Sequence, residues 1–225
     1  MATTWSLRER SSLTADEMGA MYRIHESLYA NVDRATFLRD LTDKDQVLLV
    51  SDDAGEIRGY TTLALYRDTW GWVLFSGDTG VDRSAWGGHA LQTGWLAAAM
   101  AAHDRHGPLD WLLLAGGSRT YRYLPLFFRR FWPNPSALTP PDVQVRLDAR
   151  ATERFGAAYT HGIARLGVGG LRAEHDVIRP DDPVDRFYRA RNPGFDQGDE
   201  LVCLTEISPA NLTEAGQRIL RRLSR

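Results

Sequence analysis

A long helical pattern followed by a short apolar run constrains the fold of this chain most. From Ser84 to His106, apolar residues recur with the 3.6-residue period of an amphipathic helix. The run Trp111–Ala115 has the length and character of a strand that is buried on both faces of a sheet. Another strand is expected before the helix, at Trp70–Phe75. Strand, helix and strand together predict a right-handed βαβ crossover and therefore an α/β fold.

The residues before this crossover predict two helices and an antiparallel meander. Thr14-Ala-Asp-Glu17 has the form of a capping box and predicts a helix over 15–30, and a second, short helix is expected after Asp33. Residues 46–51 and 57–66 flank a turn sequence and are rich in strand-forming residues. They predict a hairpin, to which Trp70–Phe75 adds a third strand.

The residues after the crossover predict further α/β structure. Helices are expected over 120–131, 150–166 and 209–223, and strands over 143–147 and 201–207. A proline-rich connection over 133–142 joins these parts without separating two domains. Because the chain has 225 residues, of which 43% are hydrophobic, we expect a single domain over 1–225 with one substantial core.

Composition excludes several classes of function. A net charge of −2 with 25% charged residues does not favour nucleic-acid binding. The single cysteine, Cys203, cannot form an internal disulfide or a thiolate cluster, so we expect a reducing compartment and no metal site. Residues 1–11 lack the apolar run of a signal peptide, and no apolar stretch reaches the roughly 18 to 20 residues of a membrane span. The sequence therefore predicts a cytoplasmic protein without a membrane or nucleic-acid partner.

The order of elements resembles the GCN5-related N-acetyltransferase (GNAT) family over about residues 14–132. The resemblance implies an α/β (α+β) fold with a mixed central sheet flanked by helices. Residues 143–225 would form a C-terminal α/β extension, packed on the same sheet or in a homodimer interface. In the interface alternative, the aromatic residues Phe187, Tyr188 and Phe195 would contact the second copy.

In the GNAT family a glycine-rich turn opens the long helix, and its backbone N–H groups bind the pyrophosphate of acetyl-CoA. A helix N-terminus suits this role because it offers unpaired donors and the positive end of the helix dipole. This chain has Ala85 where the family has Arg or Gln, so the motif is degenerate. The alternative is a plain turn for close packing of the helix. The residues expected to bind the cofactor are Trp86, Gly87, Gly88, His89 and Ala90.

Four side chains are candidates for catalysis. The resemblance implies that Tyr121 or Tyr123 protonates the departing thiolate, and the alternative is that both belong to the core stripe of their helix. Asp78, at the C-terminal end of a strand, is the candidate general base, and the alternative is a turn residue. His25 lies on the apolar stripe of the first helix, as a catalytic residue or as a hydrogen-bonded core histidine.

Further residues are expected to contact the substrate. Ser118 to Arg122 opens a helix directly after the buried strand and combines hydroxyls with two guanidinium groups, which suits an anion. The expected substrate contacts are Glu26, Ser76, Ser118, Arg119 and Arg122.

The resemblance implies an enzyme that transfers an acyl group from a thioester to an amine of a small molecule. The donor would be acetyl-CoA, another acyl-CoA or an acyl carrier protein. The alternative is a protein of this fold without acyl-CoA activity, which works as a binding or regulatory module or catalyses another reaction in the same cleft. The arrangement of residues 85–90 discriminates between the two, because Trp86 and His89 either leave the groove open or fill it.

Overall fold

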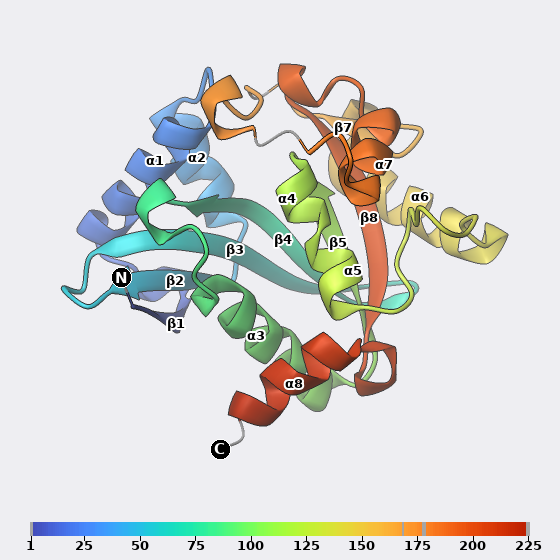
Figure 1. Cartoon of the computed structure of the whole chain (residues 1–225), viewed down its shortest axis with the longest axis horizontal. Helices are drawn as coiled ribbons and strands as arrows, with labels where there is room; N and C mark the ends of the chain where they lie inside the picture. Colours follow the sequence, from blue (N-terminus) through green and yellow to red (C-terminus); the bar gives the residue numbers. More distant parts are fainter. Residues whose placement is uncertain (1, 168, 177–178, 224–225) are drawn as a thin grey trace.

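The computed structural model describes residues 2–167, 169–176 and 179–223, and it contains one mixed sheet with helices on both faces (Figure 1). The strand order is β1-β2-β3-β4-β5-β8-β7-β6. Among the described strands, β4 and β5 form the parallel pair, and the other neighbours are antiparallel. The predicted mixed sheet is confirmed. The strands are β1 (Thr3–Glu9), β2 (Gln46–Asp52), β3 (Ile57–Asp68), β4 (Gly71–Val81), β5 (Leu109–Ala115), β6 (Tyr159–Thr160), β7 (Ile163–Arg165) and β8 (Asp199–Ile207).

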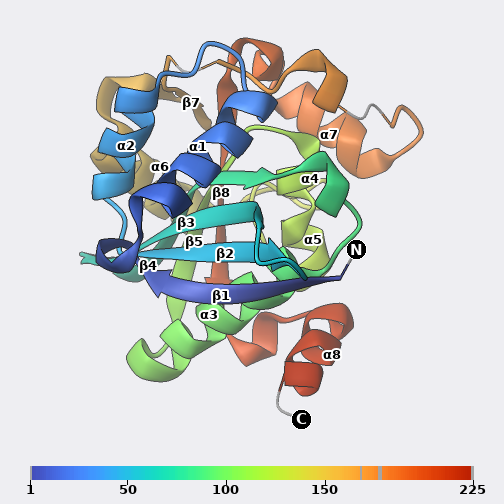
Figure 2. The same cartoon turned by 90° about the vertical axis from the view of Figure 1, so that its left-hand side faces the viewer.

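The helices divide between the two faces of the sheet. Figure 2 shows α1 and α2 on one side of the first strands, and α3 and α8 on the other. The side chains of α6 join the first face, where they pack against β4, β5 and β8. The helices are α1 (Ala15–Leu28), α2 (Arg34–Thr42), α3 (Ala90–His106), α4 (Ser118–Tyr121), α5 (Tyr123–Phe127), α6 (Pro141–Phe155), α7 (Pro183–Arg191) and α8 (Glu214–Leu223).

The starts of the first two helices follow the sequence signals. Thr14 and Glu17 form a reciprocal capping box at α1, and the Asp33 carboxylate accepts from the Thr36 N–H at 2.8 Å and caps α2. α3 begins later than its sequence pattern indicates. Asp82 caps a single 3₁₀ turn instead, and Gly87 then takes a φ of 90°, which interrupts the helical backbone before Ala90.

Alternate residues of the strands face opposite halves of the core. Leu48 and Val50 of β2 lie in the cluster with α3, whereas Val47 and Leu49 lie in the cluster with α1 and α2. On the α3 face two buried indoles, Trp95 of α3 and Trp111 of β5, have ring centroids 3.9 Å apart. Trp111 lies in the cluster with α3 and Leu112 in the cluster with α6, and every residue of β5 is buried. The apolar run is therefore buried on both faces, as its composition predicts.

Three predictions after the buried strand were wrong. Residues 143–147 lie in α6, where Leu147 and Ala151 are buried one turn apart and Val145 stays 57% exposed, so a helical stripe mimicked strand alternation. The helix expected over 150–166 ends at Phe155, and β6 and β7 follow it. The helix expected over 120–131 is broken into α4 and α5 near Pro125, which cannot donate a backbone hydrogen bond.

Both ends of the chain complete the same sheet. β1, which the sequence reading missed, pairs with β2 over its whole length. β8 pairs with β5 from Leu109↔Ile207 to Ala115↔Leu201, so the C-terminal segment extends the sheet that the first half begins. Tyr188 is 1% exposed and its hydroxyl donates to the Ala115 carbonyl at 2.9 Å, so this aromatic residue lies in the chain's own core.

Candidate active site

The two parallel strands separate at their C-terminal ends. β4 and β5 are paired from Trp72↔Leu109 to Ser76↔Leu113, and in the described strands no pair between them lies beyond Ser76. β4 continues to Val81, while the last residues of β5 remain paired with β8. A gap therefore opens at the carboxyl ends of two parallel strands, which is where open α/β sheets commonly bind ligands.

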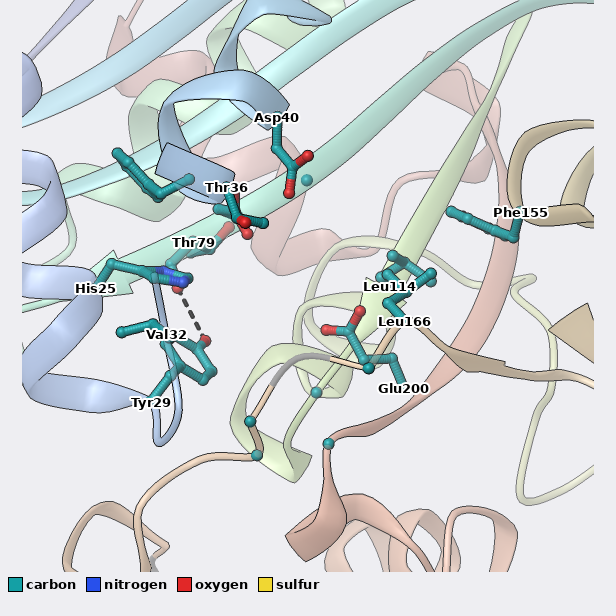
Figure 3. A pocket seen from close by; sticks show the side chains of 18 of the residues that line it. His25, Tyr29, Val32, Thr36, Asp40, Thr79, Leu114, Phe155, Leu166 and Glu200 are labelled. Atoms are coloured by element: carbon teal, nitrogen blue, oxygen red, sulfur yellow. Dashed lines mark hydrogen bonds between the residues drawn. The ribbon is translucent and has the colours of Figure 1, made fainter. Parts of the chain in front are cut away.

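A cavity of about 780 Å³ fills this gap on the face that carries α1, α2 and α6. Gly77, Asp78 and Thr79 of β4 form one wall, and Leu114 with Glu200 forms the other. Figure 3 shows Glu200 on the opposite side of the cavity from His25 and Tyr29. The volume is enough for a small molecule.

Glu200 is the most perturbed carboxyl group of this cavity. It lies at the start of β8, half-buried, and burial together with the negative charge of Asp78 raises the pKa of Glu200 to about 8. Gly116 makes room for it, because a Cβ at Gly116 would lie 2.9 Å from Oε1 of Glu200. A carboxyl group in this environment exchanges a proton near neutral pH, as a general acid or base requires.

The predicted site residue His25 lies in the same cavity, in contact with buried tyrosines. Its Nδ1 lies 2.9 Å from the hydroxyl oxygen of Tyr60, a fully buried residue of β3. Burial lowers the pKa of His25, and the charges of Asp78 and Asp40 oppose this shift. Tyr29 closes the same wall by donating to the Thr79 carbonyl at 3.1 Å (Figure 3). His25 is therefore both hydrogen-bonded and exposed to the ligand space.

The opposite face of the gap is almost closed. A second cavity there has a volume of only about 20 Å³, enough for about one water molecule, which needs roughly 10 to 15 Å³. Thr79 and Thr120 line both cavities, so they lie between them. The Ser76 hydroxyl oxygen beneath them accepts hydrogen bonds from both buried indoles, at 3.1 and 3.0 Å. Tyr123 also lines this smaller cavity, and burial raises its pKa to about 12.

The turn before α3 meets one requirement for binding an acyl-CoA and fails another. Gly87 and Gly88 are exposed, no side chain caps the helix, and space around Gly87 is open, so the turn itself suits an anionic group. Trp86 does not suit a thioester arm beside β4. Its Nε1 donates to the Val81 carbonyl at 2.9 Å, and the Arg119 guanidinium covers its ring at 3.8 Å from the centroid. The turn fits phosphate, but the two cavities described above do not reach Trp86 and Arg119, which pack against each other beside β4.

Several predicted residues lie away from the large cavity. Tyr121 is fully buried and its hydroxyl donates to the Pro133 carbonyl at 2.7 Å. Arg122 forms an ion pair with Asp182 at 2.7 Å. Ser118 is buried, and its hydroxyl bonds to Asp185. Burial raises the pKa of Asp185, but its hydrogen bonds, including the one from Ser118, hold that pKa below its usual value.

The remaining predicted contacts are at the surface. Glu26 is exposed and accepts from the Tyr22 hydroxyl at 3.1 Å, and His89 is exposed at the start of α3 without a capping hydrogen bond. Ala90, the next residue, is buried. The structure thus brings Asp78 and His25 together, and it separates them from Glu26 and His89.

Sequence reasoning missed Glu200, Tyr29 and Lys44. Glu200 follows Gly198 and Asp199 and precedes the apolar run of the last strand, which is the position of an ordinary solvated strand end. Lys44 is the only lysine of the chain, and its isolation among arginines was the one available signal. Pairing of β8 with β5 is what brings Glu200 opposite Asp78.

No group of three or more His, Cys, Asp and Glu side chains within residues 2–167, 169–176 and 179–223 is arranged to hold a metal ion. In the same part of the chain, no helix combines the length and the apolar character that crossing a membrane requires.

The comparisons with known proteins find similarity in fold alone. No family profile and no curated protein sequence matches the chain. Among solved structures, it is similar to the GNAT family N-acetyltransferase YhbS from Escherichia coli in complex with CoA, with 13% identity over 55% of this chain and 69% of that chain and a TM-score of 0.40. It is also similar to the ribosomal-protein-S18-alanine N-acetyltransferase from Escherichia coli, with 13% identity, 57% and 81% coverage and a TM-score of 0.42.

A third similar structure comes from an uncultured soil metagenomic sample. It is the aminoglycoside acetyltransferase meta-AAC0020 in complex with sisomicin, with 12% identity over 53% of this chain and 82% of that chain and a TM-score of 0.41. The fold and the site define a mixed α/β protein with a carboxylate-bearing pocket where two parallel strands separate. The three solved structures, which resemble this chain in fold, are acetyltransferases, and one of them is described as a GNAT family N-acetyltransferase.

Proposed function

We propose that the protein is an acyltransferase of the GNAT kind, which transfers an acyl group from a thioester to the amine of a small molecule. The observation that carries the proposal is Glu200, a carboxyl group with a pKa of about 8 that faces Asp78 across the large cavity. An amine must lose a proton to attack a carbonyl carbon, and a carboxylate of this pKa is matched to that task near neutral pH.

The walls of the cavity suit an amine that binds as an ammonium ion. Asp78 and Glu200 offer carboxylate oxygens on opposite sides, and the Thr79 carbonyl lies between them and His25. Glu200 in its ionised form accepts a proton from the bound ammonium and leaves a neutral amine held by Asp78. We therefore propose Glu200 and Asp78 as the groups that bind and activate the acceptor, with His25 as a further contact.

A thioester supplies the acyl group, and its sulfur needs a proton as it leaves. Tyr123 is the candidate donor of that proton, because it lines the smaller cavity on the other face of the gap. Arg119 and the exposed turn before α3 are the candidate contacts for the phosphates of acyl-CoA or of the arm of an acyl carrier protein. In this structure Trp86 lies across that route, so we derive no further step on the donor side.

The test is release of free thiol from acetyl-CoA in the presence of a panel of primary amines. We expect thiol release that depends on both the amine and the protein, and a large loss of rate in Glu200→Gln. Glu206→Gln is the matched control, since it lies on the same strand outside the cavity and bonds to the Ser208 hydroxyl. Thiol release that is unchanged in Glu200→Gln would contradict the proposal.

The second candidate is a protein of the same fold without acyl-CoA activity, and the position of Trp86 favours it. A binding module would still be stabilised by amines that enter the large cavity. It would show no rise in its thermal midpoint with acetyl-CoA, whereas a ligand that binds the folded state raises the midpoint by mass action. Thermal scans with each ligand alone therefore separate the two candidates.

A further inference from the structure

One end of the large cavity carries a buried positive charge. Lys44 is 8% exposed, and among the described residues its ammonium group forms no ion pair. Its Nζ donates to the Asp40 backbone oxygen at 2.8 Å. Burial lowers the pKa of Lys44, and the charge of Asp78 opposes this shift. A buried ammonium with unused donors favours an anionic partner.

The backbone is shaped to admit this side chain. A Cβ at Gly77 of β4 would lie 2.6 Å from Cε of Lys44, so the absence of a side chain at Gly77 allows the lysine to lie against the strand. Lys44 thereby reaches the cavity immediately beside Asp78, the next residue of the strand. The position of the lysine is therefore fixed by close packing.

A second cation lies beside the same aromatic ring. The Arg154 guanidinium of α6 is 3.7 Å from the centroid of Phe75, and Nζ of Lys44 is 5.9 Å from it. Arg154 also forms no ion pair in the described part of the chain, and the two cations repel, since Arg154 contributes to lowering the pKa of Lys44. The Tyr66 hydroxyl is buried and lies close enough to Arg154 to affect its pKa, but within the described residues it makes no hydrogen bond of normal geometry. We call Lys44, Arg154 and Tyr66 the cationic end.

Three carboxylates, Asp40, Asp43 and Glu153, line the cavity near the cationic end, and within the described residues none of them forms an ion pair with Lys44 or Arg154. Asp40 and Asp43 lie close enough to raise the pKa of Lys44, but no ion-pair contact joins them to it within the described residues. Glu200 stands across the cavity, and Asp78 lies close enough to act on the pKa of both Lys44 and Glu200. The cavity therefore has two cations without ion pairs in the described part of the chain at one end, and the Glu200 carboxyl group at the other.

From this arrangement we propose that the acceptor carries an oxyanion, a carboxylate or a phosphate, on the same small molecule as its amine. The oxyanion binds the ammonium of Lys44, the guanidinium of Arg154 and the hydroxyl of Tyr66, while the amine lies between Asp78 and Glu200. The inference rests on the proposed function for the role of the amine. The anion site itself stands on the cationic end alone.

Because Lys44 is the only lysine, a chain labelled with ¹³C at lysine Cε gives a single side-chain NMR signal that reports on it. We titrate this protein with 4-aminobutyrate, O-phosphoethanolamine, butyrate, inorganic phosphate and butylamine at constant ionic strength. We expect a saturable shift with at least one of the four compounds that carry an oxyanion. The amino acid or amino phosphate is expected to bind at least about tenfold more tightly than its matching single-charge compound. Comparison of 4-aminobutyrate with O-phosphoethanolamine shows which oxyanion is preferred.

Variants separate this inference from the proposed function. Arg154→Met should weaken binding of the anionic compounds, read from the same signal, and leave butylamine binding unchanged. Lys44→Met should also weaken binding of the anionic compounds and leave butylamine binding unchanged, as read from the thermal midpoint. Arg218→Met on the distant α8 is the control for loss of one positive charge. If butylamine binds but no anion shifts the lysine signal, the inference is overturned and the proposed function stands. If anions bind through Lys44 but amines never do, the proposed function fails and the anion site is retained.

Discussion

At the scale of single residues, the chemistry of the pocket depends on the proton of Glu200. Burial and the charge of Asp78 keep this carboxyl protonated up to a pH of about 8. Its neighbour Gly116 leaves just enough space for the carboxylate. The position therefore combines a site for a proton with a fixed geometry, which an exposed glutamate does not offer.

The pH dependence of activity should follow Glu200. Since the ionised form accepts the proton from the amine, we expect kcat/KM of the wild type to rise as pH increases through about 8. Glu200→Gln should lower the rate by about 100-fold or more and remove this rise. The measurement is a pH series of thiol release, and a wild-type profile that is flat between pH 6 and 9 would argue against Glu200 as the base.

The Glu200 carboxyl should make the folded protein less stable as pH rises, whereas it makes the activity rise with pH. Its pKa is near 4.5 in the unfolded chain and about 8 in the folded protein, so the folded state holds more protons between these values. The stabilising contribution is complete below pH 4.5 and is lost as pH rises through 8. We expect Glu200→Gln to gain stability relative to wild type as pH rises from 5 to 8.5. Urea unfolding at both pH values checks this, and a constant difference would contradict it.

At the scale of elements, the start of α3 decides which ligand reaches the gap. The 3₁₀ turn capped by Asp82 and the positive φ of Gly87 delay the helix until Ala90. The delay leaves Gly87 and Gly88 exposed, although the Gly88 N–H donates to the Ala85 carbonyl at 3.2 Å. It also carries Trp86 back over β4, where its indole donates to the Val81 carbonyl. One short segment thus places an exposed glycine turn beside an indole that packs on β4.

Removal of the Trp86 side chain should open space between the glycine turn and β4. We expect Trp86→Ala to raise the thermal midpoint shift produced by acetyl-CoA, because the smaller side chain frees the Val81 carbonyl and uncovers Arg119. Trp70→Ala is the control, as Trp70 is 51% exposed at the distant turn between β3 and β4. Weaker binding of acetyl-CoA by Trp86→Ala would instead make the indole part of the binding site.

At the scale of the whole molecule, the site exists because three distant parts of the chain share one sheet. β4, β5 and β8 meet at the gap, and α6 covers it through Arg150, whose guanidinium donates to Asp68 at 2.7 Å and to Asp110. These groups are almost completely buried, with side-chain exposures of 1%, 2% and 8%. The cluster ties α6 to the strands that carry the pocket.

Breaking this cluster should destabilise the whole domain. Arg150→Met leaves two buried carboxylates without their partner, and we expect a loss of about 3 to 5 kcal/mol in the free energy of unfolding at pH 7. Arg146→Met is the matched control, because Arg146 contacts Asp110 from a side chain that is 31% exposed, and less than about 1 kcal/mol should be lost. Equal losses in the two variants would show that burial of the cluster does not matter.

The sequence by itself determined the local structure and part of the site. Capping at Thr14 and Asp33, the long helical period and the apolar run around Trp111 all act between near neighbours, so their patterns can be read directly. Asp78 was predicted as a site residue from its expected place at the end of a strand. In the structure β4 continues to Val81, and Asp78 lines the large cavity. The fold prediction succeeded where local propensity and burial agree.

Only the tertiary structure decided which side chains meet. Glu200 reaches Asp78 because β8 pairs with β5, and Lys44 reaches the cavity because Gly77 leaves room for it. The α6 segment resembled a strand locally, and packing of Leu147 against the sheet resolved it as a helix. Contacts of this kind depend on register and on close approach between residues far apart in the chain, and these are physical properties of the packed core that no local pattern records.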